Sequence, residues 1–101
     1  MSIHYFMIEA EPLEDNPEKG DYEGAYINCW VRSDTQDMAL WQACTFIGEE
    51  GWKPVQVEDY CIAERDQYLE EDDCEQSLQC YDQAVENGLS ALFYCYEEKE
   101  T

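Results

Sequence analysis

Residues 24–31 read GAYINCWV, and small or aliphatic side chains alternate there with polar or aromatic ones. Successive side chains of a β-strand point to opposite faces of the sheet, so this alternation predicts a strand with one face in a core. The predicted core-facing residues are Ala25, Ile27, Cys29 and Val31. The opposite face carries Tyr26, Asn28 and Trp30. This strand therefore predicts a sheet with a core on one side and a Tyr- and Trp-rich second face.

The stretch after this strand predicts a helix over residues 34–50. Ser33 begins Ser-Asp-Thr-Gln, which matches the capping-box pattern at a helix start. Apolar residues then recur at spacings of three, four and seven, which places them on one helical face. They are Ala39, Leu40, Ala43, Cys44 and Ile47. Gly51 stands where a left-handed residue ends a helix. We expect the apolar face of this helix to cover the sheet.

Working outward, residues 3–10 (IHYFMIEA) and 89–96 (LSALFYCY) are apolar runs of strand length. Residues 11–23 contain two prolines and many acidic residues, which predicts a loop. A second helix is expected to begin at a cap on Asp72 or Asp73 and to end at Asn87-Gly88. Its apolar stripe comprises Cys74, Leu78, Tyr81, Ala84 and Val85.

Residues 52–66 indicate a strand whose alternation changes phase. Val55 and Val57 would share one face, whereas Tyr60 and Ile62 would share the other. Either a bulge near Asp59 shifts the register, or a tight turn there divides the stretch into two strands. Because no Gly or Asn stands at this point to favour a turn, one long, bulged strand is the preferred interpretation.

The resulting fold class is α+β, with the order ββαβ(β)αβ. We expect a two-layer sandwich in which two helices cover one face of a mixed sheet of four or five strands. Each β-α-β step should be a right-handed crossover between parallel strands. If residues 52–66 are split, residues 24–96 follow the ferredoxin-like order. Residues 1–96 should form a single domain, and residues 97–101 a frayed acidic tail.

Charge is the most unusual property of the composition. The chain has 25 Asp and Glu residues against five Lys and Arg residues, a formal net charge of −20. Nucleic acids and the anionic inner leaflet of membranes attract basic surfaces, so we expect neither as a partner. The five basic residues are scattered along the sequence. Solubility or adaptation to salt is the simpler explanation of the acidity, and attraction of a basic protein is the functional one.

Cysteine usage favours a reducing compartment. The six cysteines include no C-x-x-C pair, and the start of the chain lacks the basic region of a signal peptide. No run reaches the roughly 20 apolar residues of a membrane span. We therefore expect a cytoplasmic protein with reduced thiols. Cys29, Cys44, Cys61 and Cys95 lie among apolar neighbours, which predicts a packing role for them.

The sequence favours a non-enzymatic role. His4 is the only histidine and has no motif around it, and Ser33 is explained better as a helix cap than as a nucleophile. The sequence contains no glycine-rich phosphate loop, no paired Cys and His ligands, and no EF-hand spacing in the acidic runs. We therefore predict no catalytic residues, no metal site and no cofactor.

Two helices usually cover only one face of such a sheet, so the second face should be open and rich in aromatic residues. We predict an interface there. Its candidate residues are Tyr26, Trp30, Tyr60, Tyr94 and Tyr96. Tyr and Trp are enriched in protein interfaces because an apolar ring with a polar tip tolerates partial burial. The alternatives are that these rings pack beneath loop 11–23 or fill an ordinary half-exposed sheet.

The leading functional hypothesis is a non-enzymatic, acidic protein-binding module that engages a basic partner. An inhibitor, an immunity-type protein or a mimic of nucleic-acid charge would fit this description. A homodimer is the simplest other use of the aromatic face. The rival hypothesis from a different class is a small dimeric ligand-binding or enzymatic domain, with its pocket between that face and loop 11–23.

Overall fold

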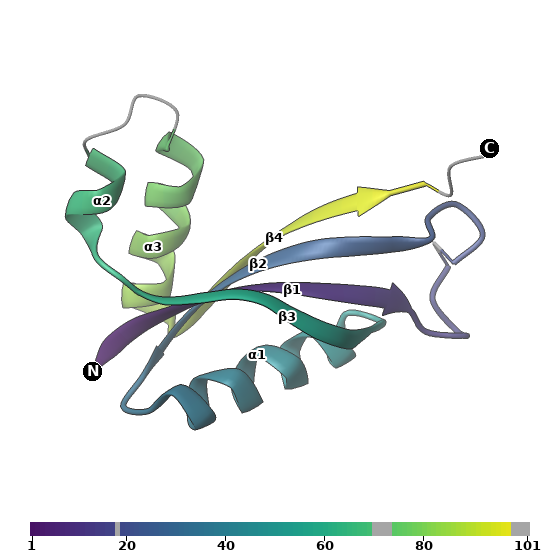
Figure 1. Cartoon of the computed structure of the whole chain (residues 1–101), viewed down its shortest axis with the longest axis horizontal. Helices are drawn as coiled ribbons and strands as arrows, with labels where there is room; N and C mark the ends of the chain where they lie inside the picture. The colour runs from purple at the N-terminus through teal and green to yellow at the C-terminus, as the bar shows by residue number, and fades with distance from the viewer. Residues whose placement is uncertain (18, 70–73, 98–101) are drawn as a thin grey trace.

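The computed structural model describes residues 1–17, 19–69 and 74–97. It shows an α+β fold whose elements follow the predicted order, with one additional short helix (Figure 1). The elements are β1 (Ser2–Pro12), β2 (Gly24–Ser33), α1 (Gln36–Glu49), β3 (Trp52–Ala63), α2 (Arg65–Leu69), α3 (Glu75–Asn87) and β4 (Leu89–Tyr96). Helix α2 is the element that the sequence did not predict.

The four strands of the described chain form one sheet in the order β3-β1-β2-β4. Every neighbouring pair is antiparallel, so the prediction of a mixed sheet is wrong. Strands β1 and β2 form the predicted hairpin and occupy the centre. Helix α1 carries the chain across β1, so β2 and β3 run in the same direction without being neighbours. Helices α2 and α3 then return the chain to the opposite edge, where β4 runs antiparallel to β2.

Strand β3 is a single strand with two irregularities in its pairing to β1. Met7 pairs with Asp59 and Ile8 with Val57, which leaves Glu58 as an extra residue, and a second shift follows between Glu9 and Ala10. The preferred bulged strand is therefore confirmed, and the split that the ferredoxin-like order required is not present. The first bulge brings Tyr60 and Val57 onto the same face, because it restores the alternation across the phase change.

The larger core lies between the sheet and α1. Ala39, Ala43 and Ile47 of α1 are fully buried against the predicted core face of β2, which confirms both patterns. The predicted cap is wrong by two residues: the Thr35 side chain accepts a hydrogen bond from the Met38 amide. Ser33 is still paired with Ser2 of β1 as the last residue of β2, so the helix begins only after it, at Gln36. The sheet and α1 thus form two packed layers.

Helices α2 and α3 lie on the other side of the sheet from α1 (Figure 1). A second buried cluster joins Cys80 and Ala84 of α3 to Trp30 of β2 and Ile3 of β1. Because Trp30 alternates with Cys29 and Val31, this cluster is on the second face, and the prediction of two helices on one face is wrong. These helices cover only the end of that face where β1 begins, and the far end of β2 and β4 extends beyond them (Figure 1).

The predicted ends of both long helices are confirmed at their glycines. Gly51 and Gly88 have φ values of 92° and 96°, the left-handed region that favours glycine. The caps predicted at Asp72 or Asp73 and most of the predicted tail, residues 98–101, lie outside the described residues. Among the described residues, no helix has the length and apolar character needed to cross a bilayer. The cytoplasmic location stays a prediction.

Candidate protein-binding surface

The uncovered end of the second sheet face carries a group of exposed aromatic side chains. We call it the aromatic surface, and it consists of the exposed Tyr26 and Tyr94 and the half-buried Tyr96. Tyr26 and Tyr94 are direct cross-strand partners and are 41% and 50% exposed. The rings of Tyr26 and Tyr96 lie 5.4 Å apart between centroids. Large side chains exposed to this extent and placed side by side are available to another molecule.

Gly24 allows Tyr96 to join this surface. The two residues are paired across β2 and β4, and a Cβ atom on Gly24 would lie 2.4 Å from the Tyr96 hydroxyl oxygen. Any other residue at position 24 would displace the Tyr96 ring. The ring reaches across the sheet, and its hydroxyl donates a hydrogen bond to Oε1 of Glu9 on β1 at 3.3 Å. Burial and the nearby Glu9 carboxylate raise the pKa of Tyr96.

Carboxylates border the aromatic surface on the β1 and β3 side. Glu9 is the cross-strand partner of Tyr26, and the bulged residue Glu58 lies beside Glu9. A hydrogen bond with Glu9 and the repulsion between the two charges raise the pKa of Glu58. Two adjacent carboxylates form a site where a cation would be stabilised. The aromatic surface is therefore electronegative as well as apolar.

Three of the five predicted interface residues come together on this surface: Tyr26, Tyr94 and Tyr96. Trp30 is on the same face but is only 1% exposed, because α2 and α3 cover it. Its Nε1 donates a hydrogen bond to the Tyr68 hydroxyl at 3.0 Å, and its ring packs on Tyr5. Trp30 is therefore a core residue rather than part of an open surface.

Tyr60 is on the opposite face, as a consequence of the bulge at Glu58. Its ring packs against Phe6, with the centroids 5.0 Å apart, and its hydroxyl lies 2.7 Å from Nδ1 of His4. The sequence showed the change of phase in this strand, but not that the bulge would move Tyr60 to the α1 side. Leu92, on the same face of β4, packs against the cluster around Trp30 and therefore belongs to the covered end.

His4 has hydrogen-bond partners at both ring nitrogens. Nε2 lies 3.2 Å from the Ser33 carbonyl oxygen, which can only accept, so Nε2 carries a hydrogen. In the neutral ring Nδ1 then accepts from the Tyr60 hydroxyl. With 3% of its surface exposed, this satisfied imidazole has the geometry of a packing residue that ties β1 to β2 and β3.

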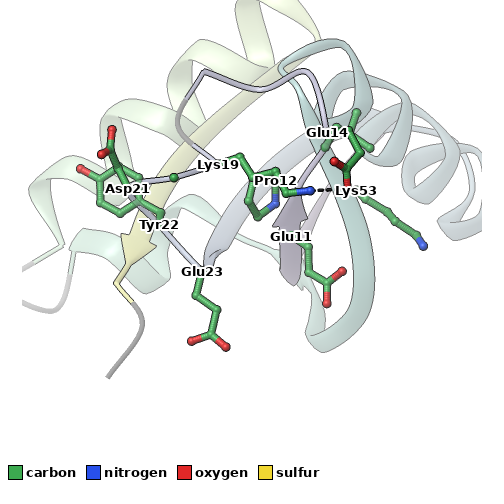
Figure 2. A pocket seen from close by; sticks show the side chains of 10 residues that line it. Glu11, Pro12, Glu14, Lys19, Asp21, Tyr22, Glu23 and Lys53 are labelled. Atoms are coloured by element: carbon green, nitrogen blue, oxygen red, sulfur yellow. Dashed lines mark hydrogen bonds and ion pairs between the residues drawn. The ribbon is translucent and has the colours of Figure 1, made fainter. Parts of the chain in front are cut away.

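A cavity of about 580 Å³ lies beside the loop between β1 and β2 (Figure 2). Its lining includes Tyr22, Lys53 and the ion pair between Lys19 and Glu14, which Figure 2 shows as a dashed line. Neither His4 nor a cysteine is among the described residues that line it. The described lining residues carry charges of both signs, including the carboxylates of Glu11 and Asp21 beside Lys53.

The cysteines occupy very different environments. Cys29 and Cys80 are buried, Cys44 and Cys61 are half-buried, and Cys95 is exposed. Burial raises the pKa of Cys29 to about 12, which keeps it a thiol at neutral pH. The packing role predicted for Cys95 is wrong, because its side chain is exposed near the end of the edge strand β4. Within the described residues, no group of three His, Cys, Asp or Glu side chains is placed to hold a metal ion.

Most basic side chains of the described chain are engaged by groups of the chain itself. Arg65 forms a two-point contact with Asp82, at 3.0 and 3.3 Å. Lys19 contacts Glu14, and Arg32 donates to the Val85 carbonyl. These contacts lie on three different parts of the fold: the β1–β2 loop, β2 and α2. They form no common basic region beside the aromatic surface.

Comparison with known proteins gives no relative: no family model, no curated protein and no solved structure matches this chain.

Proposed function

We propose that this protein is a non-enzymatic binding module that engages a basic protein partner through its aromatic surface. The observation that carries the proposal is the position of Tyr26, Tyr94 and Tyr96, which are grouped on an uncovered sheet face and bordered by the Glu9 and Glu58 carboxylates. Aromatic rings and carboxylates are both favourable neighbours for Lys and Arg side chains.

The energetics favour a cationic ligand at this surface. A guanidinium or ammonium over a Tyr ring gains roughly 0.5–1 kcal/mol at an exposed site, and more when water is excluded. A cation beside Glu9 and Glu58 would also be attracted to both carboxylates, whose mutual hydrogen bond is the main cause of the raised pKa of Glu58. An anionic ligand would gain neither contribution and would meet the net charge of −20.

The overall charge adds long-range attraction to these contacts. Opposite charges on two proteins accelerate their encounter, and the acceleration falls as salt screens the charges. We therefore expect the partner to be a basic protein, and the association to weaken steeply between low and high ionic strength.

The proposal is tested with a synthetic octapeptide of alternating Lys and Val, labelled at one end and followed by fluorescence polarisation. We expect it to bind at low salt, to bind less tightly as salt is added, and to lose affinity when Tyr94 is replaced by Ala. A matched octapeptide of alternating Glu and Val should not bind. Equal binding of both peptides, or no binding of the Lys peptide at low salt, would refute the proposal.

The rival function, a small dimeric ligand-binding or enzymatic domain, has less support. The cavity beside loop 11–23 is lined by the Lys19–Glu14 pair and by other charged residues, not by His4 or a cysteine. His4 is instead buried between two hydrogen-bond partners. These observations favour the binding module.

A further inference from the structure

The two edges of the sheet differ in how they are protected against pairing with another strand. Edge strand β3 contains two bulges, a proline at position 54 and the exposed charges of Lys53, Glu58 and Asp59. Proteins use such features to prevent an edge from adding a further strand. Edge strand β4 has none of them, because LSALFYCY contains no charged residue and no proline, and its pairing with β2 has no irregularity.

The hydrogen-bond ladder determines which backbone groups of β4 face outward. The Arg32 amide donates to the Gly88 carbonyl oxygen at 2.9 Å, so residues 32 and 88 are a hydrogen-bonded pair. In an antiparallel ladder such pairs alternate with non-bonded ones. Leu92 and Tyr94 therefore point their backbone groups toward β2, whereas Ala91 and Phe93 point theirs away from β2, at the edge of the sheet.

A strand added beside β4 would present alternate side chains to two different environments. On the second face they would lie beside the rings of Tyr94 and Tyr96, which belong to the aromatic surface. On the α1 face they would meet a cavity of about 440 Å³ lined by Trp52, Phe93 and Cys95, together with Asn16, Pro17 and Glu50. One environment suits basic side chains and the other suits apolar ones. The edge thus selects an alternating pattern.

We propose that β4 binds an extended segment of the partner as a fifth strand, and that this segment alternates basic and apolar residues. The inference rests on the proposed function and specifies how the partner is recognised. Main-chain hydrogen bonds to Ala91 and Phe93 would supply affinity, and the two side-chain environments would supply specificity. A basic segment fits better than a second copy of this chain, because two copies would each bring a net charge of −20 to the interface.

Residue-resolved amide hydrogen exchange tests the inference with the Lys–Val octapeptide as the probe. In the free protein, we expect Leu92 and Tyr94 to exchange slowly and Ala91 and Phe93 to exchange quickly. Saturation with the peptide should slow Ala91 and Phe93 at least tenfold. If the peptide binds but these two amides keep their rates, the strand-addition inference is overturned and the proposed function stands. If the peptide does not bind, both are overturned.

A variant of the edge gives an independent test. Ala91→Pro removes an outward amide without removing a bond to β2, a position where edge strands tolerate proline. Ala91→Ser keeps that amide and serves as the control. We expect Ala91→Pro to lower peptide affinity at least fivefold and Ala91→Ser to leave it within twofold. Equal peptide affinities of the two variants would overturn the inference. It would also be overturned if the free protein sediments as a dimer and its Ala91 amide already exchanges slowly, because a second copy would then occupy the edge.

Discussion

Both ends of the second sheet face carry aromatic side chains, but these are buried at one end and accessible at the other. At one end Trp30 and Tyr5 pack together beneath α2 and α3, and Trp30 is almost fully buried. At the other end Tyr26 and Tyr96 also pack together, on the part of β2 and β4 that extends beyond α2 and α3 (Figure 1). Strand alternation places all these rings on one face. The helix above them decides which are core residues and which are available to a partner.

The largest expected effect comes from truncating the covered end. Trp30→Ala should lower the free energy of unfolding by about 3–5 kcal/mol, since it empties a buried site and leaves the Tyr68 hydroxyl without its donor. Tyr94→Ala, the matched change at the open end, should cost about 1 kcal/mol or less. Urea denaturation of the two variants measures both values. Similar losses of unfolding free energy would contradict the distinction between a buried end and an accessible end of the face.

The next effect concerns binding at the open end. Tyr94→Ala should weaken the Lys–Val peptide about tenfold, roughly 1.4 kcal/mol, by removing a cation–π and packing partner. Tyr94→Phe keeps the ring and should retain most of the affinity. Isothermal titration calorimetry gives both values. Wild-type affinity in Tyr94→Ala would exclude this residue from the binding surface.

Overall charge should influence stability more modestly than these local contacts. Because most carboxylates lack a basic neighbour, their mutual repulsion destabilises the fold most at low salt. We expect the melting temperature to rise by about 5 °C between roughly 10 mM and 0.3 M sodium chloride, a shift that corresponds to about 1 kcal/mol in a chain of this size. Differential scanning calorimetry measures it. A constant or falling melting temperature would contradict the expectation.

The smallest effect is at the carboxylates beside the aromatic surface. The pKa of Glu58 is raised above its ordinary value of 4.5, first by a hydrogen bond with Glu9. A raised folded-state pKa favours the fold below the unfolded pKa, and this contribution is lost as the pH rises through the folded pKa. Carbon-detected NMR titration should show the raised pKa, and Glu9→Gln should lower it. A bound Lys–Val peptide should lower it too. A Glu58 pKa unchanged by Glu9→Gln would remove the proposed coupling.

The sequence predicted the elements well where a local pattern determined them. Alternation identified the β2 core face, helical spacing identified the buried side of α1, and the phase change around Asp59 indicated the bulge in β3. Helix α2 was missed because its five residues, RDQYL, are too few and too polar to show a period. Thr35 caps α1 instead of Ser33 because β2 stays paired with β1 through residue 33, so the helix starts two residues later than predicted.

The candidate surface was predicted in part, and its errors have a common physical cause. Tyr26, Tyr94 and Tyr96 could be grouped because each follows the alternation of a regular strand. Trp30 and Tyr60 could not be placed correctly, because their exposure depends on long-range features. The exposure of Trp30 depends on which face α3 covers. The face on which Tyr60 lies depends on which residue of β3 forms the bulge. A helical stripe shows that a helix packs on a sheet, but it does not show on which side.

The central claim is that a basic ligand binds the open end of this face, and chemical-shift mapping tests it most directly. Labelled protein would be titrated with the Lys–Val octapeptide at low salt, and the backbone and aromatic shifts of each residue recorded. The account predicts that the largest changes occur at Tyr26, Tyr94 and Tyr96, with small ones around Trp30. Shifts spread over the acidic loops, or confined to the helices, would contradict it.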